Sequence, residues 1–83
     1  MESTVIVYLR SGGKLREFLK PDVDQYTRKV DVDAGLSIEE ILAVLGVAPV
    51  MVAFAFADGK VKKLDYVPTD GETITLQSPV AGG

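Results

Sequence analysis

The residues that point most clearly to a chemical role are Gly82 and Gly83, the last two of the given sequence. They follow a strand-like run and Pro79, which fixes its own φ and favours an extended exit from the strand. Fully extended at about 3.3–3.6 Å per residue, residues 78–83 would reach roughly 20 Å beyond a sheet, far enough to enter another protein's active site. A glycine pair alone is a weak motif, because small residues are also typical of frayed termini. In this context we expect the free end to be the working part of the chain.

The side chains that most often carry catalysis are absent, because the sequence has no histidine and no cysteine. The chain therefore lacks the commonest general base, and metal sites built from imidazole or thiolate are excluded. A net charge of −3, from 9 basic and 12 acidic side chains, argues against a nucleic-acid partner and favours a basic protein partner. We expect no metal site, no bound cofactor and no self-contained enzyme.

A length of 83 residues with 47% apolar content predicts one small globular domain. No apolar run approaches the roughly 18 residues that cross a membrane, and the first residues lack a signal-peptide pattern. We expect a soluble cytoplasmic protein with no membrane partner.

The N-terminal third predicts two strands. Residues 4–9 are apolar on both parities, which is typical of a central strand. Residues 15–19 fit either a helical turn or an edge strand. In residues 26–32 one face carries Tyr26, Val30 and Val32, which predicts a half-buried second strand antiparallel to the first.

The clearest helix covers residues 38–45. Ser37 before it and Glu40 three positions later form the capping-box pattern, and Gly46 supplies a C-terminal stop. One apolar face is made at i, i+3, i+4 and i+7 by Ile38, Ile41, Leu42 and Leu45. We expect this face to pack on the sheet.

Residues 50–57 form an apolar run of strand length, and Asp58-Gly59 after it predicts a hairpin turn. Phe54 and Phe56 lie on one face of this run, and Met51 with three alanines lies on the other. The sequence leaves open which set packs beneath the helix. The other set would lie on a sheet face with little to cover it, as core or as a partner-binding patch. We expect Phe54 and Phe56 to border a partner surface.

The order of elements is strand, strand, helix and then three strands, with parallel first and last strands at the sheet centre. This order predicts the α+β class and a β-grasp layout, a mixed sheet of four to five strands with one main helix packed on one face. We expect residues 1–77 to form the domain and residues 78–83 to form a flexible C-terminal tail.

Several stretches repeat the pattern of a known family. They are Leu9-Arg10 with Leu15-Arg16-Glu17, residues 36–42 at the helix entry, the hairpin 56–59, and above all residues 70–72 with residues 77–83. In these stretches the chain resembles the ThiS and MoaD sulfur-carrier family, ubiquitin-like proteins that end in Gly-Gly. Two residues depart from the pattern, Asp58 for the usual asparagine and Glu72 for the usual aspartate. Both keep the turn chemistry, and the long segment 11–25 fits MoaD better than ThiS.

The resemblance implies that Gly83 bears the reacting carboxylate. An adenylating enzyme of the MoeB or ThiF type would use ATP to form an acyl-adenylate, which a sulfur donor converts to a thiocarboxylate. Residues 79–82 (Pro79, Val80, Ala81 and Gly82) would occupy the partner's channel, and glycine suits its narrow end because it lacks Cβ. The thiocarboxylate would deliver sulfur in molybdopterin or thiamine (thiazole) biosynthesis, with a synthase partner of the MoaE or ThiG type. The chain would then be a carrier or the small subunit of a synthase.

Two other functions stay open at this point. A ubiquitin-like modifier would be conjugated to lysines through Gly83, and a non-catalytic β-grasp interaction domain would not need the tail at all.

Overall fold

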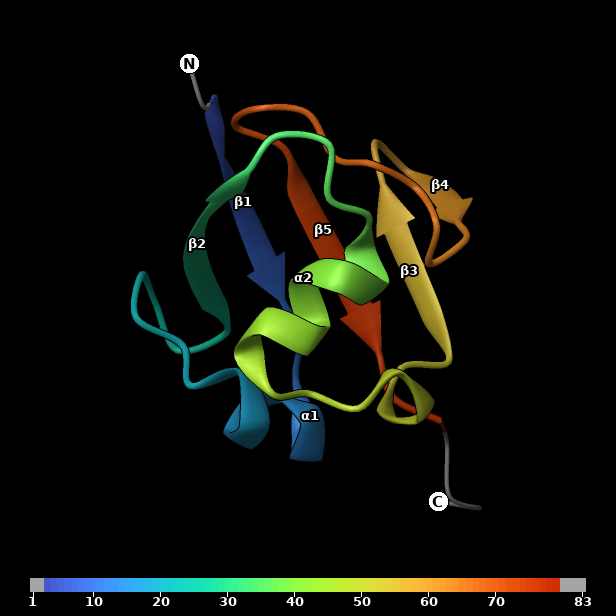
Figure 1. Cartoon of the computed structure of the whole chain (residues 1–83). Coiled ribbons are helices and arrows are strands. Elements are labelled where there is room, and N and C mark those ends of the chain that lie inside the picture. The colour runs from blue at the N-terminus through green and yellow to red at the C-terminus, as the bar shows by residue number, and fades with distance from the viewer. Residues whose placement is uncertain (1–2, 80–83) are drawn as a thin grey trace.

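The first and last strands of the chain lie side by side at the centre of a five-stranded sheet. The computed structural model describes residues 3–79, and the strand order is β2-β1-β5-β3-β4 (Figure 1). The elements are β1 (Thr4–Arg10), α1 (Gly13–Leu19), β2 (Thr27–Asp33), α2 (Ile38–Leu45), a 3₁₀ helix (Pro49–Met51), β3 (Phe54–Ala57), β4 (Lys60–Lys62) and β5 (Thr73–Gln77).

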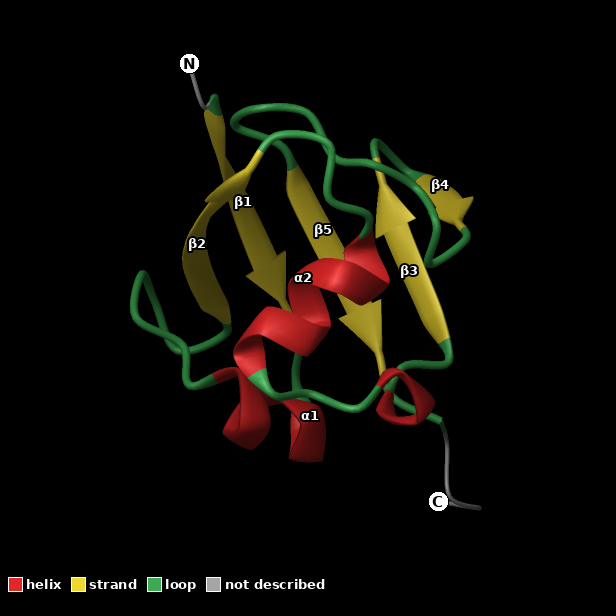
Figure 2. Cartoon of the chain, in the orientation of Figure 1, coloured by secondary structure: helices red, strands yellow, loops and turns green. Residues whose placement is uncertain are grey.

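The pairing is mixed, as the sequence predicted. β1 is antiparallel to β2, and β1 is parallel to β5, with Leu9 opposite Ile74. β3 is antiparallel to both β5 and β4. A parallel pair needs a crossover connection, and α2 lies across one face of the sheet within that connection (Figure 2). The β-grasp prediction is confirmed.

Helix α2 has the bounds that the capping pattern predicted. The Ser37 hydroxyl accepts a hydrogen bond from the Glu40 backbone N–H at 3.3 Å, and Glu40 Oε1 accepts from the Ser37 N–H at 2.9 Å. Gly46 ends the helix with a φ of 78°, where a side chain would be strained. The side chains of Ile38, Ile41 and Leu42 are fully buried, whereas Leu45 is half-buried.

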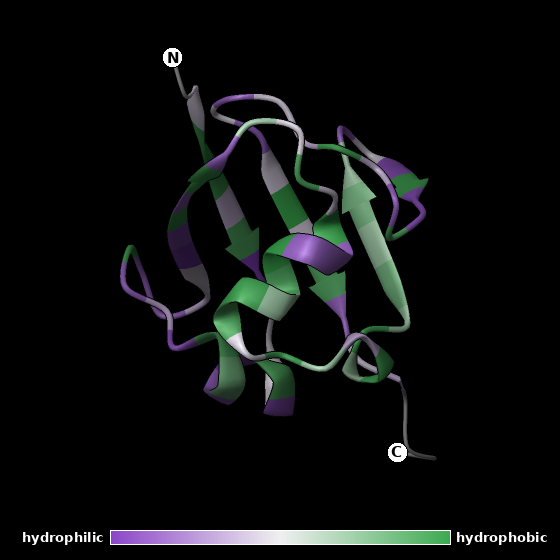
Figure 3. Ribbon diagram, in the orientation of Figure 1, coloured by the Kyte–Doolittle hydropathy of each residue, from purple (hydrophilic) through white to green (hydrophobic). Residues whose placement is uncertain are grey.

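The apolar core lies between α2 and the sheet. In Figure 3 hydrophobic residues dominate β1, β3 and much of α2, and hydrophilic residues gather in the loops and in β2. On β3 the buried residues are Ala55 and Ala57, at 0% and 1% exposure. Ala55 lies opposite Leu76 of β5, whose buried side chain helps to fill the space below the helix. The open choice on β3 is thus decided in favour of Ala55 and Ala57, and the phenylalanines lie on the other face; Ala53, which precedes the strand, is exposed.

The structure decides one open choice and corrects two expectations. Residues 15–19, which fitted a helical turn or an edge strand, belong to helix α1, whose Leu15 and Leu19, four positions apart, are both buried. The run 50–57 is a strand only from residue 54, because Pro49 begins a 3₁₀ helix whose Val50 is 81% exposed. Tyr26 precedes β2 and is only half-buried, while Thr27 is buried in its place.

The hairpin between β3 and β4 forms where the sequence predicted it. Asp58 and Gly59 both have positive φ, 54° and 74°, which is typical of the tight turn that suits twisted strands. Within residues 3–79 no helix is long and apolar enough to cross a lipid bilayer.

Candidate functional site

The candidate site is the point where the chain leaves β5. The carbonyl oxygen of Gln77, the last residue of β5, accepts a hydrogen bond from the Ala53 N–H at 2.7 Å. Ser78 is half-buried and Pro79 is exposed. Strand β5 is paired on both sides, so the start of the tail is fixed to the most central part of the sheet. We call residues 77–79 the tail root.

The predicted site residues Val80, Ala81, Gly82 and Gly83 lie outside the described residues. Their roles as channel residues and as the reacting end, and the tail boundary at residue 78, remain predictions. Of the predicted tail, the structure describes Ser78 and Pro79. Strand β5 ends at the end of the sheet where α1 and the 3₁₀ helix also lie (Figure 1).

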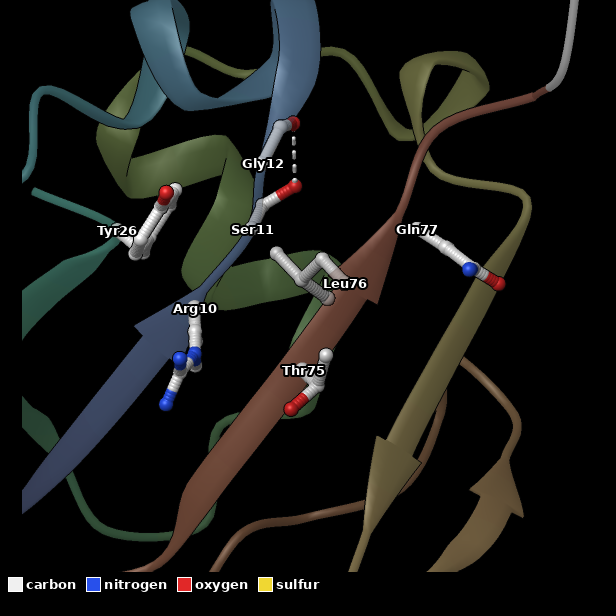
Figure 4. A pocket seen from close by; sticks show the side chains of 7 residues that line it. All are labelled: Arg10, Ser11, Gly12, Tyr26, Thr75, Leu76 and Gln77. Atoms are coloured by element: carbon white, nitrogen blue, oxygen red, sulfur yellow. Dashed lines mark hydrogen bonds between the residues drawn. The ribbon is translucent and has the colours of Figure 1, made fainter.

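Two shallow hollows flank the tail root. One has a volume of about 230 Å³ and is lined by Arg10, Ser11, Gly12, Tyr26, Thr75, Leu76 and Gln77 (Figure 4). The second has a volume of about 320 Å³ and is lined by residues 11–13 and 76–78. Because β1 and β5 run parallel, the turn after β1 lies next to the tail root, and this turn forms a wall of both hollows. Such open hollows fit a partner's side chain better than an enclosed substrate.

An aromatic patch adjoins the tail root on the face opposite α2. The rings of Phe54 and Phe56 are 6.3 Å apart at their centroids. Phe54 is 54% exposed, Phe56 is half-buried, and Val61 opposite Phe56 is 62% exposed. Phe54 also lies opposite Gln77 in the sheet register. The structure thus places both phenylalanines on an uncovered face beside the tail root, and their contact with a partner remains a prediction.

Sequence reasoning missed Val61 and Arg10 as neighbours of this site. Arg10 lies opposite Thr75 of β5, and Thr75 lies opposite Phe56 of β3. The hollow that Arg10 lines and the aromatic patch are therefore connected by one row of residues across β1, β5 and β3. Only the strand register reveals it, because residues 10, 56 and 75 are far apart in the sequence.

The Asp70-Gly71-Glu72 loop serves the fold at the other end of β5. Asp70 Oδ1 accepts a hydrogen bond from the Ile6 N–H at 2.8 Å, and the Glu72 carboxylate accepts from the Tyr66 hydroxyl at 2.9 Å. This hydrogen bond to Glu72 raises the pKa of Tyr66, and burial adds to the effect. The Asp70 carboxylate thus holds the loop onto β1, and the Glu72 carboxylate ties it to Tyr66. Within residues 3–79 no three acidic side chains gather closely enough to bind a metal ion.

The family of the chain follows from its sequence as a whole. A family model described as Mut7-C ubiquitin matches residues 4–81. This chain belongs to the Mut7-C ubiquitin family. The match is consistent with the resemblance to ubiquitin-like proteins of the ThiS and MoaD type. No curated protein matches the sequence of this ubiquitin-family chain.

Two solved structures share the ubiquitin-like fold of this chain. The crystal structure of SAMP1 from Haloferax volcanii is similar at a TM-score of 0.65 and 21% identity, covering 94% of this chain and 99% of that one. A de novo designed protein based on ubiquitin is similar at a TM-score of 0.60 and 20% identity, covering 95% and 93%. At these identities the likeness establishes the β-grasp fold of the ubiquitin-family domain.

Proposed function

We propose that this ubiquitin-family chain is a sulfur carrier whose Gly83 carboxylate is activated and loaded by a partner enzyme. The supporting observation is that the chain leaves the central strand β5 at the tail root, beside an exposed aromatic patch, and that Gly82-Gly83 follow a few residues later in the sequence. A rigid domain with a reactive extension is the arrangement that a carrier needs, because the partner binds the domain and receives the tail. The sulfur chemistry follows from the resemblance to ThiS and MoaD.

The reaction needs activation because a terminal carboxylate, with a pKa of about 3.5, is ionised at neutral pH and is a poor electrophile. A Gly83 carboxylate oxygen would attack the α-phosphorus of ATP, release pyrophosphate and form an acyl-adenylate. A sulfur donor at the sulfide oxidation level would then attack the acyl carbon. The bond to AMP would break, AMP would leave, and a thiocarboxylate would remain.

The chain's own residues contribute binding and reach in this scheme. With no histidine or cysteine in the sequence, the general base and the thiol chemistry would come from the partner. Phe54, Phe56 and Val61 offer an apolar surface, and buried aromatic residues are typical anchors of protein interfaces. Because Phe54 lies opposite Gln77, a partner bound there would also hold the tail root. An adenylating enzyme of the MoeB or ThiF type would bind this face first, and a synthase of the MoaE or ThiG type would follow in the molybdopterin or thiazole branch.

The test changes the end of the tail and leaves the domain intact. One variant carries an extra residue after Gly83, a second ends at Ala81, and a third is Gly82→Val. We expect all three to keep the melting temperature, because a projecting terminus contributes few packed contacts. The first two should support no ATP–pyrophosphate exchange with the cognate adenylating enzyme, and Gly82→Val should react more slowly because a β-branched residue stiffens and widens the tail.

The matched control carries one extra residue before Met1 and should react like the unmodified chain. Intact mass spectrometry gives a second measurement. Replacing one oxygen of the terminal carboxylate by sulfur adds about 16 mass units to the chain. Full sulfur loading of the variant that ends at Ala81 would overturn the carrier function. Isopeptide-linked conjugates through Gly83, without thiocarboxylate, would select the modifier function instead.

A further inference from the structure

Two arginines share one aromatic ring beside the tail root. Arg10 ends β1 and Arg16 lies on α1, and their guanidinium carbons are 5.8 and 5.5 Å from the centroid of the Tyr26 ring. Both distances are typical of cation–π contacts. Two positive groups on one ring also repel each other, and a negative group that contacts both would relieve that repulsion.

The Tyr26 ring is held in place by its backbone. The Tyr26 N–H donates a hydrogen bond to Asp24 Oδ1 at 2.8 Å, and its carbonyl oxygen accepts one from the Ser11 N–H at 3.0 Å. The hydrogen bond from Tyr26 holds the pKa of the Asp24 carboxyl below its usual value, with smaller contributions from Thr27 and from the charge of Arg10. The Tyr26 backbone is therefore fixed between β1 and the loop before β2, and its ring lies within cation–π distance of both guanidinium groups.

The hydrogen-bond donors of these two arginines are not used by the described part of the chain. Within residues 3–79 the ion pair is that of Arg28 with Asp22, at 3.5 Å. Arg28 also donates to two backbone carbonyl oxygens that follow α1, both at 3.3 Å. Arg10 and Arg16 contact the ring instead. A guanidinium stacked by its face leaves its N–H edge free, and that edge matches a carboxylate with two parallel hydrogen bonds.

The segment that carries this cluster has a net charge opposite in sign to that of the whole chain. Residues 10–28 contain five basic and three acidic side chains, although the net charge of the chain is −3. Arg10 and Tyr26 line the hollow that Thr75 and Gln77 of β5 complete (Figure 4). An acidic side chain in this hollow would contact the domain next to the tail root. The net charge favoured a basic partner, but the local geometry favours an acidic contact here.

We propose that Arg10 and Arg16, stacked on Tyr26, bind a carboxylate side chain on the surface of the adenylating enzyme and so orient the tail root toward its active site. This inference rests on the proposed function, since it names the contact by which the partner of that function recognises the domain. A protein carboxylate is a better occupant than a nucleic-acid phosphate backbone, which the net charge of −3 repels.

The test measures the steady-state KM and kcat of the adenylating enzyme for the chain in the ATP–pyrophosphate exchange assay. Arg10→Glu and Arg16→Glu should each raise KM about tenfold, the factor that about 1.4 kcal/mol of lost binding produces. The value of kcat should not change, because the reacting carboxylate is untouched. Raising the salt concentration should increase KM for the unmodified chain, because salt screens the attraction between the arginines and the carboxylate. It should lower KM for the double variant, because there salt screens the repulsion between like charges.

Lys60→Glu is the matched control, because it reverses one charge at the exposed edge strand β4. It should leave KM unchanged, and thermal unfolding should show that every variant is folded. If Arg16→Glu is unfolded, Arg16→Gln tests the same contact. A double variant with the KM and the salt dependence of the unmodified chain would overturn the inference, as would an equal effect of Lys60→Glu or arginine-dependent binding of a single-stranded RNA oligonucleotide. Absence of exchange with the unmodified chain would instead refute the proposed function.

Discussion

Leu42 is the residue whose removal should destabilise the domain most clearly. Its side chain is 0% exposed, on the face of α2 that packs onto the sheet. Truncating a buried leucine to alanine removes apolar contacts and leaves a cavity, at a typical cost of about 2–5 kcal/mol. A chain of this length has a total unfolding free energy of roughly 4–12 kcal/mol. Leu42→Ala should therefore remove a large part of the stability, and Leu42→Asp should abolish folding because it buries an unpaired charge.

The measurement is the free energy of unfolding from urea titration, supported by thermal unfolding. A loss of about 3 kcal/mol corresponds to a fall in Tm of roughly 12–24 °C for a domain of this size. The urea dependence of the unfolding free energy should stay unchanged if the native fold is kept.

Val44→Ala is the matched control, because Val44 lies on the same helix and is 66% exposed. It should be neutral or slightly stabilising, since alanine has the higher helix propensity. A loss below about 1 kcal/mol for Leu42→Ala, or equal losses for both variants, would contradict the packing of α2 described above.

Three further predictions concern the start of α2 and the hairpin. Ser37→Ala should cost about 1 kcal/mol at neutral pH by removing the helix cap. Hydrogen bonds from Ser37 lower the pKa of Glu40 in the folded state. The stabilisation from these hydrogen bonds is therefore present above the unfolded pKa of Glu40 and is lost as the pH falls through its folded pKa. Ser37→Ala keeps the backbone N–H that donates to the Glu40 carboxylate, so Glu40→Gln tests this contribution. Urea unfolding should show a smaller difference between Glu40→Gln and the unmodified chain in acid than at pH 7, and an equal difference would contradict the capping box. Gly59→Ala should cost about 1–2 kcal/mol, because Gly59 has a φ of 74° with open space around its Cβ position and the cost is one of backbone conformation alone. Asp58→Asn should change stability by less than about 0.5 kcal/mol, because asparagine also tolerates this conformation.

Helix α2 and the hairpin could be predicted because the residues that determine them are neighbours in the sequence. Ser37 and Glu40 satisfy each other's backbone groups across a single turn, so the start of α2 follows from local chemistry. Asp58-Gly59 fixes the hairpin for a similar reason. The parallel pairing of β1 with β5 was predicted from the apolar composition of these first and last strands and from the single main helix in the connection between them. The Gly-Gly pair and the resemblance to a ubiquitin-like family could also be recognised from the sequence alone.

The tertiary structure decided the features that depend on contacts between distant residues. The alternation of alanine and phenylalanine in residues 53–57 has the same period whichever face is buried. Only the space left by α2 and Leu76 selects Ala55 for the inside and exposes Phe54. Helix α1 was ambiguous because seven residues carry too little periodicity to separate a helix from a strand.

The cluster of Arg10, Arg16 and Tyr26 shows the same limit for the functional site. Its three residues come from a strand end, a helix and a loop, and no sequence spacing brings them together. The register of β1 against β5 places Arg10 opposite Thr75, two residues before the tail root. The sequence determined that Gly82-Gly83 follow the last strand, and the packing of distant segments determined which surface lies beside the tail root, because a surface is set by spatial neighbours and not by chain neighbours.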